Sequence, residues 1–526
     1  MKKILYLMSV LVFCLLAVSC GDDDTIYNTA ARASFSISEA GDGYEINKPI
    51  SFTDTSTPET GSSIKSYLWE FGDESNSTST EQNPSFTYTK EGVYTVTMTI
   101  IDNHGLKASS SQSITVLDPS AAISVQWSAE IPGSLTGGSS PAVSADGTSV
   151  YLLSGGSATE PGRLSAYNIS TGGTSWVLDI DAAMVAAHDG GSEKAGCKDI
   201  YSSPSVGSNG NIYFVARDLK DTGANRRLFV FAATPKGAVD WTYTNADANL
   251  YAITPAVDAS GNVYVANRKG KIFKINEGNG SVYDSGIGDV TGGLTLSKTG
   301  VLYGAGKGQT GFFGFDTATG TGTWVYNTEL GGASSAFTGA LRSTQTSIGN
   351  DGTVYMVADR ITGGMIIALN ADGSLKWKYD TETAIADGGV VISADGTIYA
   401  NAGVSTEDNK SGIIALNADG SLKWKYSVDT SVQTSPIIDN RGYIHFVAAD
   451  ATYYIVKPDG SLFSSYSLGE ACASAPVMDA AGNTFVAVTK DGVLQLMCVT
   501  TRAKSYAIDA AWAMRGQNPQ RTGLQK

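Results

Sequence analysis

The sequence predicts an all-β protein in which a small β-sandwich precedes a β-propeller. Three observations support this prediction. Residues 33–118 alternate apolar and polar side chains with the period of strands. From about residue 122 to residue 515, one unit of four short strands recurs every 40–50 residues or so. The chain also has 60 glycines in 526 residues and only 17% charged residues, which favours many tight turns around a large core.

The charge balance excludes some classes of function. The formal net charge is −15 and the sequence pI is about 4.7. Nucleic acids recruit basic surfaces, so a nucleic-acid partner is not expected. Only three histidines occur, His104, His188 and His445, which leaves little material for histidine metal sites or catalytic triads.

The first twenty residues have the pattern of a signal peptide. Lys2 and Lys3 precede an apolar run over residues 4–18, which is too short to span a bilayer as a helix. Residues 16–20 (LAVSC) resemble a bacterial lipobox, which implies lipidation of Cys20 and cleavage after residue 19. Without the two leader lysines the charge becomes −17. Residues 21–32 then form an acidic, flexible tether.

The tether suggests where the protein is located. Three aspartates at 22–24 directly follow Cys20, and this run is similar to the signal that sends some lipoproteins to the outer cell surface. We therefore expect an outer membrane protein that is lipid-anchored and faces the cell exterior. The periplasmic face is the alternative. Contact with the membrane is expected through the lipid anchor only.

Three cysteines remain once Cys14 leaves with the signal peptide and Cys20 takes the lipid. These are Cys197, Cys472 and Cys498, and their spacing indicates neither a disulfide framework nor a zinc site. Packed free thiols are expected, and one disulfide among the three stays open.

Residues 33–118 contain three short motifs: SYLWEFGD at 66–73, NPSFTY at 83–88 and GVYTV at 92–96. Together they resemble a PKD domain over the whole segment. Glu70 and Glu74 depart from the commoner PKD sequence without threatening the fold. The expected core aromatics are Trp69, Phe71, Phe86, Tyr88 and Tyr94. The resemblance implies an Ig-like spacer or recognition module without catalysis.

The repeat is clearest where residues 366–379 (IIALNADGSLKWKY) recur unchanged at 413–426. Each copy has a small-residue strand, a tight turn, a second strand with an aromatic residue or His at one place, a third strand, and a fourth strand that usually carries Trp. The aromatic place is occupied by Tyr151, Tyr213, Tyr264, Tyr303, Tyr355, Tyr399, His445 and Phe485. The Trp place is occupied by Trp176, Trp241, Trp324, Trp377 and Trp424, with Tyr283 and Tyr466 expected to take its place elsewhere.

Eight copies predict eight blades over residues 122–515, with seven blades as the alternative. Isolated blades cannot bury both faces, so the rings of Trp and Tyr should wedge between neighbouring sheets. The pattern resembles PQQ-like (quinoprotein-type) propeller repeats, and residues 511–523 resemble a segment found at an end of such propellers. Residues 516–526 are assigned to a C-terminal tail. We expect the strand around Trp127 to close the last blade, with residues 505–508 as the other candidate.

Loop lengths predict which rim binds a ligand. The first-to-second and third-to-fourth turns are short, whereas the long connections at 154–162, 181–201, 217–227, 329–342 and 403–412 share the opposite rim. Candidate ligand-binding side chains on that rim are Arg217, Arg226, Arg268, Lys307, Arg342, Arg360, Tyr251 and Phe337. The cations could attract an anionic ligand, or they could pair with Asp218, Asp221 and Asp359 as ordinary surface charges. His188, Asp189, Glu193, Cys197 and Asp199 share one insertion, where ordinary loop polar groups are expected rather than a metal site.

These features favour a non-catalytic, surface-anchored lipoprotein whose propeller rim binds a polysaccharide or oligosaccharide. An envelope scaffold for other proteins is the alternative, so the expected partner is an extracellular glycan or an envelope protein. The resemblance to quinoproteins raises a PQQ-dependent dehydrogenase as a second alternative, but no adjacent-cysteine or haem-binding Cys-x-x-Cys-His motif occurs. No cofactor is expected, and PQQ and Ca²⁺ would be needed only by such an enzyme.

Overall fold

The computed structural model describes residues 30–38, 43–135, 139–156, 160–187, 202–217, 227–245, 254–267, 269–284, 290, 293–306, 311–326, 345–360, 363–381, 389–405 and 410–526. The chain divides into two compact units, one ending at Ala121 and one from Ala122 to Lys526. Among the described residues, no helix is both long enough and apolar enough to cross a membrane.

The first unit is the predicted sandwich of two sheets. One sheet has the order β1-β3-β6 and the other β2-β8-β7-β4-β5. The strands are β1 (Phe35–Ile37), β2 (Tyr44–Glu45), β3 (Pro49–Asp54), β4 (Ile64–Glu70), β5 (Thr78–Ser79), β6 (Ser85–Thr87), β7 (Gly92–Asp102) and β8 (Lys107–Leu117), followed by the short 3-10 helix η1 (Pro119–Ala121).

The five expected aromatics form the core of this unit. Trp69, Phe71 and Tyr88 are buried, and Phe86 and Tyr94 pack against them. The rings of Phe71 and Phe86 stack with centroids 4.2 Å apart. The Tyr88 hydroxyl donates to the Phe71 carbonyl at 2.6 Å, and Trp69 Nε1 donates to the Glu81 carbonyl at 2.9 Å. Both polar ring atoms are thus satisfied inside an otherwise apolar core.

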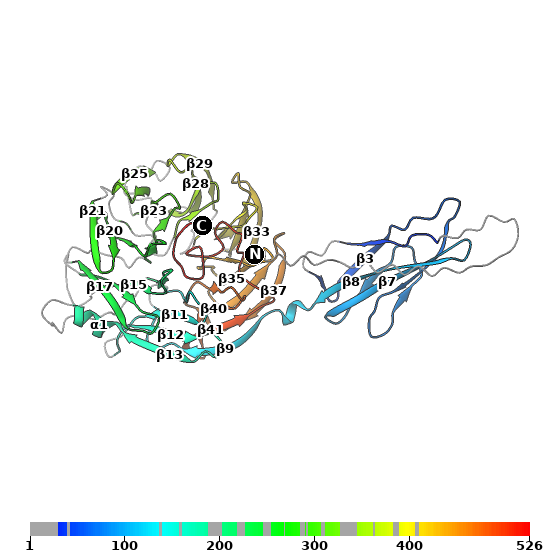
Figure 1. Cartoon of the computed structure of the whole chain (residues 1–526), viewed down its shortest axis with the longest axis horizontal. Helices are drawn as coiled ribbons and strands as arrows, with labels where there is room; N and C mark the ends of the chain where they lie inside the picture. Colours follow the sequence, from blue (N-terminus) through cyan, green and yellow to red (C-terminus); the bar gives the residue numbers. More distant parts are fainter. Residues whose placement is uncertain are drawn as a thin grey trace. The chain divides into compact units, whose positions relative to one another are not determined.

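The described residues of the second unit form eight sheets, which we number blades 1 to 8, and Figure 1 shows them arranged around a ring. Blade 1 contains β10 (Ala142–Val143), β11 (Ser149–Ser154), β12 (Arg163–Asn168) and β13 (Thr174–Asp179), and blade 2 contains β14 (Ser205–Val206), β15 (Ile212–Arg217), β16 (Leu228–Ala233) and β17 (Val239–Asn245). Blade 3 contains β18 (Ala256–Val257), β19 (Val263–Ala266), β20 (Lys271–Asn276) and β21 (Asn279–Asp284), and blade 4 contains β22 (Thr295–Leu296), β23 (Val301–Ala305), β24 (Phe312–Asp316) and β25 (Thr321–Tyr326).

Blade 5 contains β26 (Ser347–Ile348), β27 (Val354–Arg360), β28 (Gly363–Leu369) and β29 (Leu375–Asp380), and blade 6 contains β30 (Val391–Ile392), β31 (Ile398–Ser405), β32 (Lys410–Leu416) and β33 (Leu422–Val428). Blade 7 contains β34 (Ile437–Ile438), β35 (Ile444–Val447), β36 (Thr452–Val456) and β37 (Leu462–Ser467). Blade 8 combines strands from two distant segments of the chain. It contains β38 (Ala471–Cys472), β39 (Val477–Met478), β40 (Thr484–Lys490) and β41 (Val493–Thr500), together with β9 (Ser124–Glu130).

The strand around Trp127 closes the ring, as predicted. β9 pairs antiparallel with β41, and Trp127 lies opposite Cys498. The competing segment at 505–508 instead forms a single bridge from Tyr506 to Asp439 of blade 7. Pairing strands from distant parts of the chain satisfies the edge of β41 and ties the ring shut.

Aromatic rings lock neighbouring blades together, as the repeat predicted. Trp377 of blade 5 lies against Gly420 in the third-to-fourth turn of blade 6, and its Nε1 donates to the Ala418 carbonyl at 3.0 Å. The same ring-on-glycine contact recurs around the molecule in the pairs Trp127/Gly172, Trp176/Gly237, Trp241/Gly278, Tyr283/Gly320, Trp324/Gly373 and Trp424/Gly460. Glycine is required because its positive φ shapes the turn and a side chain would collide with the ring.

The strand register corrects the positions expected for Tyr283 and Tyr466. In blades 3 and 7 the row that holds Trp elsewhere holds Ser281 and Ser464. Tyr283 and Tyr466 sit two residues further along the strand. Tyr283 still covers the turn of the next blade, whereas Tyr466 is 46% exposed. The difference arises because β41 and β9 are joined by no third-to-fourth turn, so blade 8 offers Tyr466 no glycine to cover.

Lys376 on β29 should make the stability of the folded protein depend measurably on pH, through its contact with Asp351 in blade 5. Burial by itself would raise the pKa of Asp351, but the hydrogen bond and charge of Lys376, at 2.8 Å, together with bonds from Thr353, lower it to about 2. A carboxyl group whose pKa is lowered by folding stabilises the folded state at pH values above the ordinary pKa of the group. This stabilisation by Asp351 is lost as pH falls from about 4 towards 2. Replacing Lys376 by Met should therefore flatten the acid part of the stability-versus-pH curve, measured by urea unfolding. An unchanged curve would contradict this assignment.

Candidate functional site

The described residues confirm that the two rims differ. In every blade the first and second strands are joined by a short turn, as in residues 144–148 and 349–353, and in blades 1 to 7 so are the third and fourth strands. The connections after second strands, such as the one between β15 and β16, and those between blades leave from the opposite rim, which we call the long-loop rim. Helix α1 (Ile180–Ala187) begins one such connection, the one that the sequence analysis gave as the long segment 181–201.

Most of the predicted ligand-binding residues fall outside the description. Arg217 ends β15 and Arg360 ends β27, so the backbone places both at the long-loop rim as expected, but their side chains are not described. Arg226, Tyr251, Arg268, Lys307, Phe337 and Arg342 lie outside the described residues, as do Cys20 and the group His188, Asp189, Glu193, Cys197 and Asp199. Their roles stay predictions.

Hydroxyl groups two residues before the first strands link neighbouring blades near the axis of the ring. The backbone N–H of Ala475 donates to Ser140 Oγ at 3.0 Å, that of Ser140 to Ser203 Oγ at 3.0 Å, and that of Ser203 to Thr254 Oγ1 at 3.1 Å. These bonds connect blades 8, 1, 2 and 3 in succession. They explain the Ser-Pro or Thr-Pro pairs at Ser140, Ser203 and Thr254, because each of these hydroxyls satisfies a buried donor of the preceding blade.

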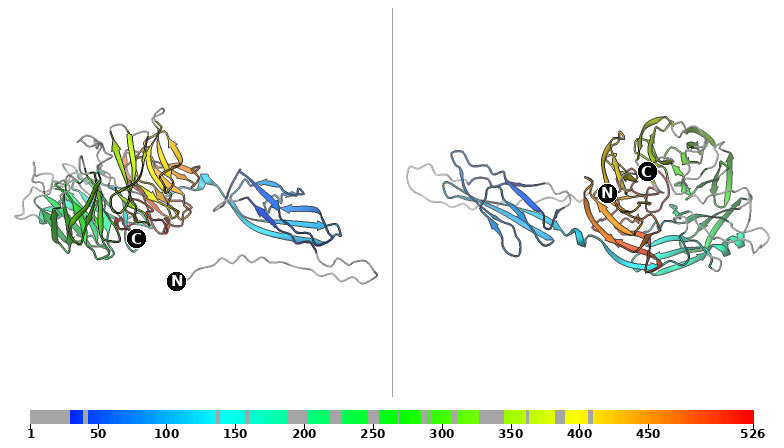
Figure 2. Two further views of the ribbon diagram at one scale, coloured as in Figure 1. Left: turned by 90° about the horizontal axis from the view of Figure 1, so that it is seen from above. Right: turned by 180° about the vertical axis from the view of Figure 1, so that it is seen from behind.

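The C-terminal segment is not a tail outside the propeller, contrary to the sequence assignment of 516–526. Residues 512–525, here the C-terminal strap, run along the inner strands, and Figure 2 shows the C-terminus on one face of the ring. Strap carbonyls accept hydrogen bonds of 2.7–2.9 Å from Ile392, Ile438, Val143, Val206, Val257 and Leu296, and Gln525 Nε2 donates to the Gly349 carbonyl at 2.9 Å. These partners belong to blades 6, 7, 1, 2, 3, 4 and 5. They adjoin the short turns, so the strap closes the axis on that side.

Arg521 anchors the strap where blades 8 and 1 meet. Its side chain is buried, with Nε donating to the Pro141 carbonyl and Nη2 to the carbonyls of Ala475 and Pro476 at 3.2 and 3.3 Å. Nη1 donates to the Arg515 carbonyl at 3.3 Å. Burial, with the nearby charge of Arg515, lowers the pKa of Arg521. The guanidinium thus bridges carbonyls of blade 1 (Pro141) and blade 8 (Ala475 and Pro476).

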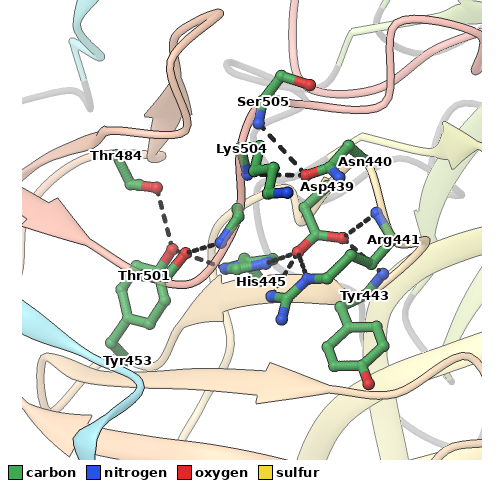
Figure 3. Close-up of polar contacts among 11 residues, drawn as sticks. Asp439, Asn440, Arg441, Tyr443, His445, Tyr453, Thr484, Thr501, Lys504 and Ser505 are labelled. Carbon is green, nitrogen blue, oxygen red and sulfur yellow. Dashed lines mark hydrogen bonds and ion pairs between the residues drawn. The ribbon is translucent and has the colours of Figure 1, made fainter. Parts of the chain in front are cut away.

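A buried polar cluster occupies the contact between blades 7 and 8 (Figure 3). Asp439 Oδ2 accepts from Arg441 Nη2 at 2.7 Å and from His445 Nε2 at 3.0 Å. Burial by itself would raise the pKa of Asp439, but the bond from His445 and the charges of His445 and Arg441 lower it. The sequence signals this cluster only as a histidine in a row of tyrosines. His445 and Tyr453 have no exposed surface, so the cluster cannot meet a substrate.

The described residues bear on a metal site only through their His, Cys, Asp and Glu side chains. Within them, no group of three His, Cys, Asp or Glu side chains is placed to hold a metal ion. The buried cation near the axis, Arg521, already donates to four carbonyls. Cys472 and Cys498 are free thiols, and burial raises the pKa of each to about 12, so neither is reactive at neutral pH.

Together these features define the chain as a propeller of PQQ-like repeats behind a PKD domain. The family model described as PKD domain matches residues 37–116. The family model described as outer membrane protein assembly factor BamB matches residues 110–324, 224–386 and 288–452, which overlap and together span more than half of the chain. The chain belongs to this BamB family.

Individual relatives resemble parts of the chain. Collagenase ColA of Bacillus cereus is 33% identical over 143 residues, covering 26% of this chain and 14% of the collagenase. The chain therefore spans a small part of that relative. The crystal structure of BamB from Moraxella catarrhalis covers 72% of this chain and 99% of its own, with 14% identity and a TM-score of 0.47. A quinoprotein alcohol dehydrogenase-like protein from Bacteroides thetaiotaomicron covers 81% and 93%, with 14% identity and a TM-score of 0.37. Neither structural likeness bears on function.

Proposed function

We propose that this protein is a non-catalytic binding protein of the cell envelope, held by a lipid on Cys20, whose long-loop rim binds a polysaccharide or oligosaccharide. The observation that carries the proposal is the difference between the two faces of the ring. Short turns and the C-terminal strap close one face, so only the opposite rim combines a rigid scaffold with long, variable connections. No cofactor is needed for this role.

The ligand class rests on charge and on the PKD domain. Six cations are predicted at the long-loop rim of a protein whose overall charge is strongly negative, and such a group would attract an acidic glycan. The PKD domain and the acidic tether would hold the propeller away from the membrane, where polysaccharide is accessible. The BamB family match is consistent with an envelope location and a binding role.

Purified protein without residues 1–20 should be tested against a panel of acidic and neutral polysaccharides by affinity electrophoresis. We expect retardation by at least one acidic polysaccharide, and we expect Arg268→Ala and Arg360→Ala each to weaken it several-fold. Lys236→Ala is the matched control, because this exposed lysine lies in a third-to-fourth turn on the opposite rim. Retardation by no polysaccharide, or equal weakening by Lys236→Ala, would contradict the proposal.

The family match itself favours a second candidate, a scaffold for envelope proteins. The two functions differ in where the propeller must lie. Protease added to intact cells should digest a surface-exposed propeller and spare a periplasmic one. Full protection, with digestion after the outer membrane is permeabilised, would favour the scaffold and remove the glycan-binding proposal.

A further inference from the structure

One position in the third strand is buried in seven blades and partly exposed in blade 7. It directly precedes the residue that pairs with the Trp row, and in blade 7 it is held by Tyr454. In the other blades the residues at this position are at most 2% exposed: Ser165, Phe231, Phe273, Phe313, Ile367, Ile414 and Met497. Packing between blades therefore does not require a phenol here.

The exposure of Tyr454 follows from its place at the long-loop rim. β36 begins directly after the tight second-to-third turn of residues 448–451, and this short connection leaves the ring partly uncovered. Tyr426, near the end of β33 in blade 6, meets Tyr454 with ring centroids 6.3 Å apart and is also partly exposed. The buried Phe446 of β35 stacks on Tyr454 with centroids 5.1 Å apart. Both phenols are thus held on a rigid base at the boundary between blades 6 and 7 (Figure 1).

A third phenol lies at the same rim on the other face of blade 7. Tyr466, next to the end of β37, pairs with Tyr453 and is 46% exposed. Paired residues share a face of a sheet and successive residues alternate, so Tyr466 and Tyr454 lie on opposite faces of the blade. Tyr426, Tyr454 and Tyr466, here the tyrosine edge, therefore line the long-loop rim on both sides of blade 7.

Two exposed carboxylates accompany the tyrosine edge. Asp429 directly follows β33, and Asp450 lies in the turn before β36. Partial burial raises the pKa of Tyr454, and the charges of Asp450 and Asp429 raise it further, which places both carboxylates near the phenol. Asp450 Oδ1 accepts from the backbone N–H of Thr452 at 3.0 Å, which orients the carboxylate. A carboxylate accepts several hydrogen bonds, so Asp450 can also accept from a ligand.

We propose that the tyrosine edge binds an uncharged sugar residue of the polysaccharide at the long-loop rim, an inference that rests on the proposed function. The apolar face of a sugar ring packs on an aromatic ring, and sugar hydroxyls donate to carboxylates. Asp429 and Asp450 would repel a uronic acid or a sulfated sugar. The predicted cations all precede blade 6, from Arg217 in blade 2 to Arg360 in blade 5. Acidic sugars would thus bind at blades 2 to 5 and a neutral sugar at blades 6 and 7.

Saturation-transfer NMR with neutral hexasaccharides tests the inference. Protein without residues 1–20 is mixed at pH 7 with hexasaccharides of cellulose, laminarin, mannan, xylan and amylose, and we expect transfer to at least one of them. Tyr454→Ile, which introduces the residue of blades 5 and 6, should weaken binding at least ten-fold, and Asp450→Asn several-fold. Tyr379→Phe is the matched control, because Tyr379 holds the position of Tyr426 in blade 5, where the next blade has Ile414 in place of Tyr454.

The outcomes separate this inference from the proposed function. Transfer to none of the hexasaccharides, or equal binding by wild type, Tyr454→Ile and Asp450→Asn, would overturn the inference even if an acidic polysaccharide retards the protein. Binding of polylysine that is lost in Tyr454→Ile, without transfer to any neutral sugar, would assign the tyrosine edge to a cationic partner and overturn it as well. Retardation by no polysaccharide would instead contradict the proposed function itself.

Discussion

Deleting residues 512–526 is expected to destabilise the propeller more than any single substitution discussed here. The deletion removes hydrogen-bond acceptors from the inner strands of six blades and empties the buried positions of Trp512, Met514 and Arg521. Each unsatisfied buried donor costs about 1–3 kcal/mol. We expect little folded, soluble protein at 37 °C, measured by circular dichroism and size-exclusion chromatography. Deleting Lys526 alone is the control and should leave folding unchanged.

Substitutions at Arg521 measure how much this one side chain of the strap contributes to the stability of the propeller. Arg521→Met keeps much of the buried volume but removes the donors to the carbonyls of Pro141, Ala475 and Pro476. The expected loss is roughly 3–5 kcal/mol of unfolding free energy, typical of breaking a buried polar network. Arg521→Lys should recover only part of it, because an ammonium cannot reach carbonyls on both blades with the geometry of a guanidinium. A wild-type urea midpoint for Arg521→Met would contradict the proposed bridge.

Gly420→Ala is expected to be much more destabilising than Gly352→Ala. Both glycines have positive φ, 86° and 82°, so the backbone cost of alanine is similar at the two positions. At Gly352 a Cβ atom would meet nothing within 4 Å, whereas at Gly420 it would lie 2.6 Å from the Trp377 ring. The difference between the two variants therefore measures the contact between blades 5 and 6. Overpacking of this kind costs about 1–3 kcal/mol.

Urea unfolding of the two glycine variants, with Trp377→Ala in addition, provides the measurement. Combining Gly420→Ala with Trp377→Ala should cost less than the sum of the two single changes, because the ring that collides with the new methyl group is absent. If Gly420→Ala and Gly352→Ala lose the same stability, the inter-blade role of the tryptophans is wrong.

The regular features of the fold could be predicted from the sequence. The repeated Ser-Pro, Asp-Gly and Trp positions mark strand, turn and interface in every blade, because each blade meets the same packing requirement. Trp127 could be matched to the last blade, since it supplies the fourth-strand Trp that blade 8 otherwise lacks. The PKD aromatics were equally clear, because each lies on the inward face of a strand.

The features that the sequence analysis missed depend on single, non-repeated contacts. The strap has no periodic pattern, and its partners lie hundreds of residues away, as Arg521 and Pro141 do. The register of Tyr466 could not be predicted, because it depends on a turn that blade 8 lacks. His445 was visible as an exception in a row of tyrosines, but its partner Tyr453 could not be foreseen, nor could the bond from Tyr453 to Thr484 of another blade. The ligand-binding residues of the long-loop rim stay predictions.

Hydrogen exchange of the inner-strand amides tests the central claim that the C-terminal strap closes one face of the ring. Four inner-strand amides, each in a different blade, donate only to carbonyls of the strap, which lie up to 376 residues away in the sequence. They are the amides of Val143, Val206, Val257 and Leu296. We predict that all four exchange as slowly as amides in the middle of β16 or β28. Fast exchange at these four positions in the intact protein, with slow exchange in the blade cores, would contradict the closed ring.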